Sequence, residues 1–130
     1  MPKIIIASGP VIVENGKVLL NKHGDTTFWK FCGGKVEDFE TTLLDNARRE
    51  AKEEVGIELT ILYEVPYFYY TKKETSDGLV DVILVHYLAS RVGEVVPGDD
   101  IDEWAWLDIA ALPADLAPNI IPALTHFKLI

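Results

Sequence analysis

Residues 33–57 read GGKVEDFETTLLDNARREAKEEVGI, a glycine-led loop followed by a segment with helical spacing. Thr42 opens that segment and Asp45 follows three positions later, a pairing that satisfies the free amides of a first helical turn. Gly56 closes it, and glycine is common just past a helix end because it tolerates positive φ angles. The pattern therefore predicts a helix over 42–55.

Three glutamates share one face of this predicted helix. Glu50, Glu53 and Glu54 stand at i, i+3 and i+4, so that they fall within an arc of roughly 100°. The adjoining flank carries an apolar stripe made up of Leu44, Ala47, Ala51 and Val55. The helix can thus bury one side in a core while three carboxylates face a cleft.

This grouping of acids carries a free-energy cost for the helix. Like charges at i and i+4 destabilise a helix by roughly 0.2 to 0.5 kcal/mol, and acids near its C-terminal end oppose the helix dipole. A hard divalent cation would favour the arrangement, because Mg²⁺ prefers oxygen ligands and keeps waters that bridge to phosphates. Spacing alone leaves a second interpretation open, a solvated face whose charge is offset by Arg48, Arg49 and Lys52.

Most of the remaining sequence has strand patterns. Asn15-Gly16 separates two apolar runs and predicts a two-residue hairpin turn. An aromatic segment at 28–31 predicts a short strand before the loop that starts at Gly33. Residues that favour a pleated surface predict further strands within the runs 59–70, 79–89 and 101–108.

The tail contains prolines and predicts one or two short helices over 109–116 and 119–127. Strands around one strongly indicated central helix, with a helix at the end, are typical of an α+β sandwich. We therefore expect a mixed β-sheet flanked by helices, in a single domain over residues 1–130.

Charge narrows the classes of partner. The formal net charge is −9, with 21 acids against 12 bases, and such a field repels the phosphate backbones that nucleic-acid-binding proteins must neutralise. We therefore expect no extended nucleic-acid partner. A small phosphate substrate would meet the same repulsion unless divalent cations stood between its phosphates and the carboxylates.

The cysteine count and the apolar runs indicate the cellular compartment of the protein. Cys32 is the only cysteine, so an intrachain disulfide is impossible, and this suits a reducing compartment. The apolar run after Lys3 is broken by Gly9-Pro10 and has no cleavage pattern, which argues against a signal peptide. No run approaches the length of a membrane span and no basic amphipathic face appears. We expect a cytoplasmic protein with no membrane partner.

The stretch at 33–57 resembles the Nudix box, the signature of the MutT-like Nudix hydrolases. The box consists of Gly, five residues, Glu, seven residues, Arg-Glu-apolar, one residue, Glu-Glu, one residue and Gly-apolar. Its named positions correspond here to Gly34, Glu40, Arg49, Glu50, Ala51, Glu53, Glu54, Gly56 and Ile57. The resemblance implies an α/β/α sandwich and an enzyme that cuts the diphosphate linkage of a nucleoside diphosphate joined to another group.

Two positions depart from the family pattern. Eight residues rather than seven separate Glu40 from Arg49, so Thr41 could displace Glu40 from the contact with Arg49 that ties loop to helix in the family. Counting back from Arg49, Thr42 keeps the usual cap position, and we expect the helix register to be intact. Cys32 stands where proline usually precedes the paired glycines, which loosens the backbone.

The resemblance implies roles for the box residues. Glu50, Glu53 and Glu54 would hold one to three Mg²⁺ or Mn²⁺ ions together with the Gly34 carbonyl. Glu53 would contact the attacking water, while Glu50 and Glu54 would be the firmer ligands, and Glu50 would also serve the reaction. The remaining box residues would have structural roles, namely Gly33, Glu40, Arg49 and Gly56.

Such sites often include one more acid, outside the box. The spacing ahead of Trp106 favours Asp100, and an ordinary turn acid is the alternative interpretation of that residue. For the substrate, Tyr69 lies where alternation puts two rings on each face of a strand, so it could stack on a base or pack inward. Possible phosphate partners, with Lys22 and Lys35 preferred, are Lys22, His23, Lys35, Lys72 and Lys73.

Three functions remain open at the level of sequence. The compact length favours a nucleoside triphosphate pyrophosphohydrolase. An ADP-ribose pyrophosphatase is the nearest enzymatic alternative, and a Nudix-fold nucleotide-binding module without turnover is an alternative from a different class. Each would bind a small nucleotide or nucleoside diphosphate derivative, and each is compatible with a monomer or a homodimer.

Overall fold

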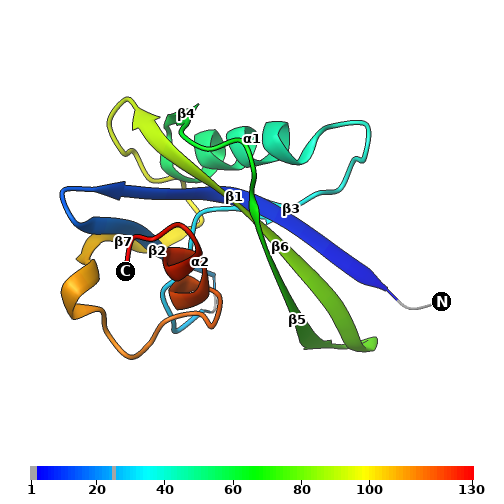
Figure 1. Cartoon of the computed structure of the whole chain (residues 1–130). Coiled ribbons are helices and arrows are strands. Elements are labelled where there is room, and N and C mark those ends of the chain that lie inside the picture. The colour runs from blue at the N-terminus through cyan, green and yellow to red at the C-terminus, as the bar shows by residue number, and fades with distance from the viewer. Residues whose placement is uncertain (1–2, 25) are drawn as a thin grey trace.

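The computed structural model describes residues 3–24 and 26–130, which form one mixed β-sheet with a helix on each face (Figure 1). The elements in chain order are β1 (Ile4–Glu14), β2 (Lys17–His23), β3 (Gly34–Lys35), α1 (Leu43–Val55), β4 (Glu58–Ile61), β5 (Tyr67–Thr75), β6 (Gly78–Val92), β7 (Ile101–Asp108), a 3₁₀ turn (Ile109–Ala111) and α2 (Ile120–His126). The predicted mixed sheet flanked by helices is confirmed. No helix in the described residues is long and apolar enough to cross a membrane.

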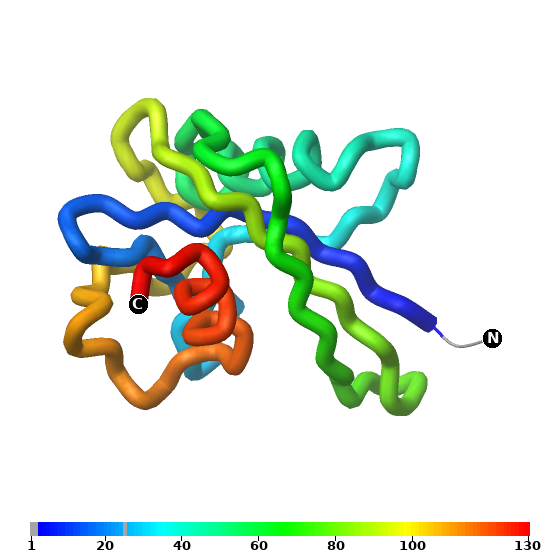
Figure 2. The backbone as a smooth tube through the Cα atoms, in the orientation of Figure 1, coloured from blue at the N-terminus to red at the C-terminus, as the bar shows by residue number. Residues whose placement is uncertain are grey.

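The sheet is built around β1. Its strand order is β4-β6-β1-β2-β7, with β3 also paired to β1 and β5 to β6. The long β1–β6 pairing is parallel, and the other strand pairs in the described residues are antiparallel. Figure 2 shows the β5–β6 hairpin extending beyond the rest of the sheet, on the side where β1 begins. This extension forms one wall of the cleft described below.

Alternating side chains of the sheet supply a separate core for each helix. Ile12 and Leu19 face α1, and they pack in one buried cluster with the helix residues Ala51 and Val55. Val11 and Leu20 point the other way, into a cluster that includes Ile120 and Leu124 of α2 and also Trp29 and Phe31. Two core layers therefore hold both helices against the same sheet.

The local predictions with the strongest turn and cap chemistry are confirmed. Asn15 and Gly16 have φ angles of 52° and 74°, and they join β1 to β2 as the predicted hairpin. Helix α1 has Thr42 as its N-cap, with the hydroxyl accepting a hydrogen bond from the Asp45 amide at 3.0 Å, and ends at Gly56. The extra residue of the box therefore lies in the loop, and the helix register is intact.

Three elements differ in their bounds from the predicted segments. The run 59–70 contributes to two strands, because its halves pair with different stretches of β6 and Pro66 lies between them. The segment 28–31 makes only isolated bridges, at Trp29 and Lys30. The segment 109–116 forms only a short 3₁₀ turn, whereas the helix predicted over 119–127 is present as α2.

The loop predicted from Gly33 also contains a short strand. Gly34 and Lys35 form β3 and pair with Ser8 and Ala7 of β1. This pairing holds the glycine pair against the middle of the sheet, directly beside α1. The location of the site described next depends on it.

Candidate active site

The acidic edge of α1 opens into a cleft of about 880 Å³. Residues of α1, β1, β3, β5 and β6 and His23 at the end of β2 line this cleft, together with the segments around 26–33, 98–101 and 117–119. Glu50, Glu53 and Glu54 all contribute to its lining, as the helical spacing predicted. Ala47, Ala51 and Val55 on the adjoining flank are fully buried. The helix therefore presents its acids to the cleft because its apolar stripe is fixed in the core.

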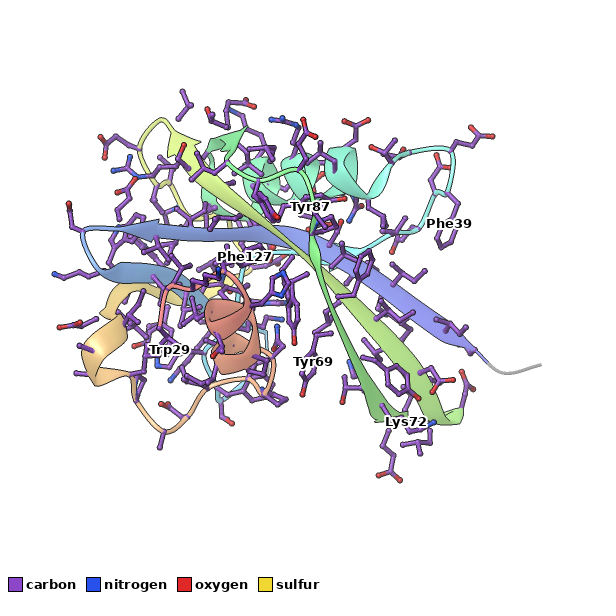
Figure 3. The ribbon with its side chains drawn as sticks, viewed as in Figure 1. Trp29, Phe39, Tyr69, Lys72, Tyr87 and Phe127 are labelled. Atoms are coloured by element: carbon purple, nitrogen blue, oxygen red, sulfur yellow. The ribbon has the colours of Figure 1, made fainter. Side chains whose placement is uncertain are left out.

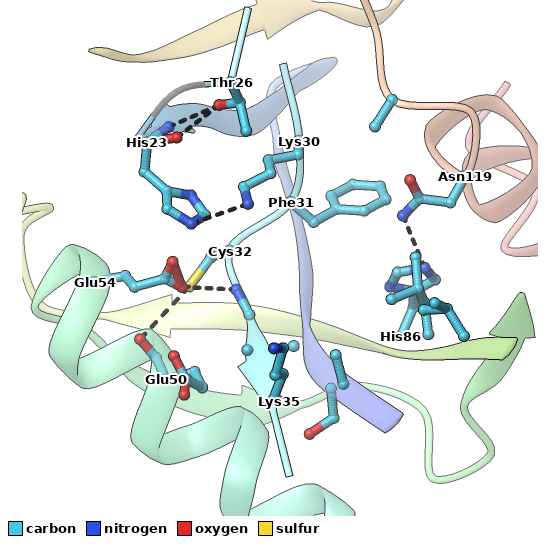
Figure 4. Close-up of a pocket in the computed structure, with 18 of the residues that line it drawn as sticks. His23, Thr26, Lys30, Phe31, Cys32, Lys35, Glu50, Glu54, His86 and Asn119 are labelled. Atoms are coloured by element: carbon cyan, nitrogen blue, oxygen red, sulfur yellow. Dashed lines mark hydrogen bonds between the residues drawn. The ribbon is translucent and has the colours of Figure 1, made fainter. Parts of the chain in front are cut away.

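Glu54 is held by the glycine loop (Figure 4). Its Oε2 accepts a hydrogen bond from the Gly33 amide at 2.8 Å, and the buried Cys32 thiol donates to the same oxygen at 3.5 Å. Burial raises the pKa of the Glu54 carboxyl to about 7, although the Gly33 amide acts in the opposite direction. Cys32, which stands in the usual proline position, thus supplies a donor that proline lacks.

Glu50 packs directly on the backbone of Gly34. A Cβ atom at position 34 would overlap the Glu50 carboxyl group, so glycine is required there for the carboxylate to lie where it does. The Glu50 side chain is only 15% exposed, and its Oε1 is 3.1 Å from Nη2 of Arg49. Burial raises the pKa of Glu50, partly offset by the charge of Arg49.

Glu53 is the open member of the three. Its side chain is 58% exposed, and both carboxylate oxygens accept hydrogen bonds from Nη1 of Arg49, at 3.0 and 3.1 Å. Arg49 therefore holds two of the three acids, Glu50 and Glu53, and limits their repulsion.

Asn46 ties the glycine loop to the helix. Its Nδ2 donates to the Gly34 carbonyl at 3.0 Å and to the Ser8 hydroxyl at 2.9 Å, while its Oδ1 accepts from Nη2 of Arg49 at 2.7 Å. In the described residues Glu40 makes no contact with Arg49, because it is exposed and sits in a turn where its amide donates to Asp38. The extra residue has thus separated Glu40 from its family contact, and Asn46, which sequence reasoning missed, connects loop and helix instead.

Asp100 lines the same cleft from the segment that precedes β7. The segment before β7 is attached to the end of α1, since the Val96 amide donates to the Val55 carbonyl and the Gly98 amide to the Glu54 carbonyl, both at 2.8 Å. Asp99 and Asp100 then line the cleft. Asp100 therefore shares the cleft with the helix acids, and its role as the further acid of the site stays a prediction.

The predicted substrate contacts divide into two groups. Lys35 and Tyr69 line the cleft, and Figure 3 shows Tyr69 projecting from β5 on the side of α2. Lys22 is not among the lining residues, and its ammonium pairs with Asp115 at 3.3 Å. The prediction for Lys22 therefore receives no support from its position.

Sequence reasoning missed further residues of the cleft wall. Lys30 lies half-buried next to the site, and only its alternation with the core residues Trp29 and Phe31 hinted at this. At the other end of the cleft, the Asn119 amide donates to Nε2 of His86 at 3.1 Å, beside the ring of Phe31 (Figure 4). Nothing in the spacing of the tail pointed to Asn119. We name Phe31, His86 and Asn119 the aromatic recess.

The donor set has the chemistry of a site for a hard cation. Carboxylates and the Gly34 carbonyl are the oxygen ligands that Mg²⁺ and Mn²⁺ take in proteins. Burial disfavours the charged forms of Glu50 and Glu54, and a bound cation would compensate for this. Within residues 3–24 and 26–130, no three acidic, histidine or cysteine side chains are already grouped to hold an ion. The acids are instead satisfied by Arg49 and the glycine loop.

Comparisons with known proteins agree on one family. Residues 4–127 match the model of the NUDIX domain. The solved structure of a MutT NUDIX hydrolase from Burkholderia pseudomallei superposes with a TM-score of 0.76 at 26% identity, over 95% of this chain and 97% of the other. The E. coli ORF135 protein gives a TM-score of 0.74 at 28% identity, over 98% and 90% of the two chains.

A third solved structure is similar to this chain in fold alone. An ADP-ribose pyrophosphatase from Streptococcus suis superposes with a TM-score of 0.61 at 23% identity, over 84% of this chain and 77% of the other. Among curated proteins, none matches the chain.

Proposed function

This chain belongs to the NUDIX domain family and is a pyrophosphohydrolase of phosphoric anhydrides, and we propose that its substrate is a nucleoside triphosphate, cleaved to a nucleoside monophosphate and diphosphate. In this reaction the oxygen of a water forms a bond to phosphorus. The bond from that phosphorus to the bridging oxygen breaks, diphosphate leaves with the electron pair, and the proton of the water passes to solvent.

The observation that carries this proposal is a single cleft with two unlike ends. One end has the acidic edge of α1, where a phosphate chain with its cations would lie. The other end is the aromatic recess, where burial lowers the pKa of His86 to about 4, so that its ring is neutral at pH 7. An amide and a neutral imidazole beside an aromatic ring suit a planar heterocycle. A nucleotide has its base and its phosphates at opposite ends in the same way.

A divalent cation belongs to this proposal. When bound, Mg²⁺ or Mn²⁺ would neutralise charge on the diphosphate oxygens and lower the pKa of the attacking water. Glu50, Glu53, Glu54 and the Gly34 carbonyl are the groups that we expect to hold it, with Asp100 as the acid from outside the box.

The chain's own residues would orient the reactants. Glu53 is the most exposed of the three helix acids, which supports it as the group that contacts the water, with Arg49 holding its carboxylate in place. Lys35 would contact a phosphate and Tyr69 the nucleoside, since both line the cleft. We place the enzyme in the cytoplasm, in keeping with its single buried thiol, and expect small nucleotides as its partners.

The experiment is hydrolysis of a panel of nucleotides and nucleotide sugars with Mg²⁺ or Mn²⁺, with both products identified. Nucleoside monophosphate plus free diphosphate supports the proposal. Nucleoside monophosphate plus a phosphorylated sugar would favour an ADP-ribose pyrophosphatase, the activity for which the Streptococcus suis neighbour is named. Binding without turnover under either cation would indicate a non-catalytic nucleotide-binding module instead.

The Glu53→Gln variant tests the site itself. Turnover should fall by about 10²-fold or more, because a group that positions or deprotonates the nucleophile contributes on that order. Glu58→Gln is the matched control, since Glu58 is an exposed acid paired with Lys52 beyond the end of the same helix and does not line the cleft. Equal turnover in the two variants would remove Glu53 from the catalytic site.

A further inference from the structure

Lys30 occupies a fixed position in the wall of the cleft. Its backbone amide and carbonyl both bond to Asn21 of β2, each at 2.9 Å. The neighbouring Trp29 bonds on its other side to the segment that precedes α2, through its amide to the Asp115 carbonyl at 2.8 Å. The backbone of Lys30 is therefore held from two directions, and its side chain projects into the cleft from a rigid base.

His23 holds the end of this side chain. Nζ of Lys30 lies 3.0 Å from Nε2 of His23, as Figure 4 shows. The pairing of β2 with β7 shifts register between Lys22 and His23, and such irregularities re-aim side chains at the end of a strand. Thr26 then fixes the backbone of His23, with hydrogen bonds of 3.1 and 2.8 Å to its amide and carbonyl.

The charge states of His23 and Lys30 make the ammonium the donor and the ring nitrogen the acceptor of this hydrogen bond. Burial first, and the nearby Lys30 second, lower the pKa of His23, which favours a neutral ring. A neutral ring nitrogen can accept a hydrogen bond from the ammonium, whereas a charged ring could only repel it. His23 therefore orients Lys30 without neutralising its charge.

Lys30 lacks an anion of its own. Within residues 3–24 and 26–130, carboxylates form ion pairs with Lys22, Lys52 and Lys72, but none lies within 4.0 Å of the Lys30 ammonium. The nearby Glu54 is already bonded to the Gly33 amide. Burial lowers the pKa of Lys30, so the pocket disfavours its charge until an anion arrives. The remaining ammonium hydrogens are available for such a group.

We infer that Lys30, positioned by His23, binds an anionic oxygen of the terminal diphosphate part of the substrate. This inference rests on the proposed function. Phe31, the next residue, faces His86 and Asn119, so the aromatic recess lies on one side of the segment and the Lys30–His23 pair on the other (Figure 4). A nucleotide with its base in the recess would have its outer phosphates at the pair. Lys30 would then supply positive charge to phosphates that the acidic wall by itself repels.

The test is calorimetric binding of inorganic diphosphate in the presence of Mg²⁺, with a nucleoside monophosphate as the second probe. Lys30→Met removes the donor but keeps the length of the chain, and we expect diphosphate affinity to fall about tenfold or more, as for a lost charge-assisted hydrogen bond. Lys30→Arg should retain affinity within about threefold, because it keeps the cation. Monophosphate affinity should change less than about twofold, since the pair lies away from the recess.

Two further variants sharpen the result. Lys17→Met removes the same charge from the far end of β2, outside the cleft, and should leave diphosphate affinity unchanged. His23→Leu should weaken diphosphate binding, whereas His23→Gln, which keeps an acceptor, should restore part of it. Full binding by His23→Leu would contradict the positioning role.

Diphosphate binding by Lys30→Met within about twofold of the unsubstituted protein would overturn the inference, and so would a loss confined to the monophosphate. These outcomes are separate from a failure of the proposed function, which would appear as unsubstituted protein that binds diphosphate but cleaves no nucleoside triphosphate. In hydrolysis assays, Lys30→Met should raise KM more than it lowers kcat, because the contact exists before the reaction starts.

Discussion

At the scale of single residues, the position of the Glu50 carboxylate depends on the absence of a side chain at Gly34. A Cβ at position 34 would overlap the carboxyl group of Glu50, which is the far end of a flexible side chain and can move away. Gly34→Ala should therefore fold with a stability change of about 1 kcal/mol or less, while the Glu50 carboxylate leaves its position. A displacement of about 1 Å in a catalytic group costs on the order of 10²-fold in rate.

Paired measurements of thermal unfolding and turnover check the Gly34→Ala prediction. Normal unfolding with low turnover is the expected combination. A variant that keeps full turnover would show that Glu50 does not need the position it has beside Gly34.

The roles of Asn46 and Glu40 give a second prediction at this scale. Asn46→Ala leaves the Gly34 carbonyl and the Ser8 hydroxyl without their donor, which should cost about 1 to 3 kcal/mol of stability. Turnover should fall about tenfold or more, as for groups that orient catalytic ligands. Glu40→Ala should change stability by less than about 0.5 kcal/mol, because Glu40 is exposed and makes no side-chain contact with Arg49.

Chemical denaturation compares the stability of Asn46→Ala and Glu40→Ala, and steady-state kinetics compares their turnover. The family pattern alone predicts that Glu40 matters more, since it is a named box position and Asn46 is not. If Glu40→Ala proved the more damaging change, the inserted residue would not have replaced the family's tie between loop and helix.

At the scale of elements, α1 depends on its first turn. The Thr42 hydroxyl accepts from the Asp45 amide at 3.0 Å, so Thr42→Ala should lower the free energy of unfolding by about 1 kcal/mol. For a chain of 130 residues this corresponds to a fall in Tm of roughly 3 to 5 °C. The measurement is thermal unfolding followed by circular dichroism.

Thr41→Ala is the matched control for this prediction. Thr41 is the exposed neighbour of the cap and makes a backbone bond, from its amide to the Asp38 carbonyl, that the substitution retains. Equal destabilisation by the two substitutions would mean that the Thr42 hydroxyl does not cap the helix.

Elements were predictable where short-range chemistry specifies them. The hairpin at Asn15-Gly16 and the helix after Thr42 follow from local backbone preferences and caps, which do not depend on distant residues. In the run 59–70, Glu64 and Pro66 already lower the β propensity, but the bounds of the two strands are decided by their separate pairings with β6. Strand boundaries of this kind depend on partners that lie far away in the sequence.

At the scale of the whole molecule, burial of the site couples stability to pH. The pKa of Glu54 is about 7 in the folded protein against an ordinary value of 4.5. Below about pH 4.5 the carboxyl is protonated in both states, and between 4.5 and 7 the unfolded chain loses the proton first. The contribution of Glu54 to stability is therefore present at low pH and is lost as the pH rises from 4.5 through 7, by an amount on the order of 3 kcal/mol.

This linkage predicts how cation and pH act together. Without divalent cation, the free energy of unfolding should fall between pH 4.5 and 7 more steeply than it does for Glu54→Gln, which has no proton to exchange at this position. Added Mg²⁺ should stabilise the protein more at pH 8 than at pH 5, because the ionised carboxylate is the form that binds a cation. Urea titrations at the two pH values measure both effects. Equal stabilisation by Mg²⁺ at both values would mean that Glu54 is not a ligand.

The sequence by itself determined the acidic helix, its cap and its register. Residues within one or two helical turns of each other decide these features, so the spacing of Glu50, Glu53 and Glu54 already implied their common face. The resemblance of the surrounding box to a known family implied that the protein cleaves a phosphoric anhydride bond.

Only the tertiary structure decided what surrounds those acids. Asn46 reaches Gly34 and Gly98 bonds to the end of α1 because the fold brings separate segments together, and Lys30 meets His23 because its backbone pairs with Asn21 of β2. Such contacts follow from strand pairing and close packing, which local patterns do not encode. The acids and their partner Arg49 could therefore be predicted, whereas Asn46, Lys30 and Asn119 could not.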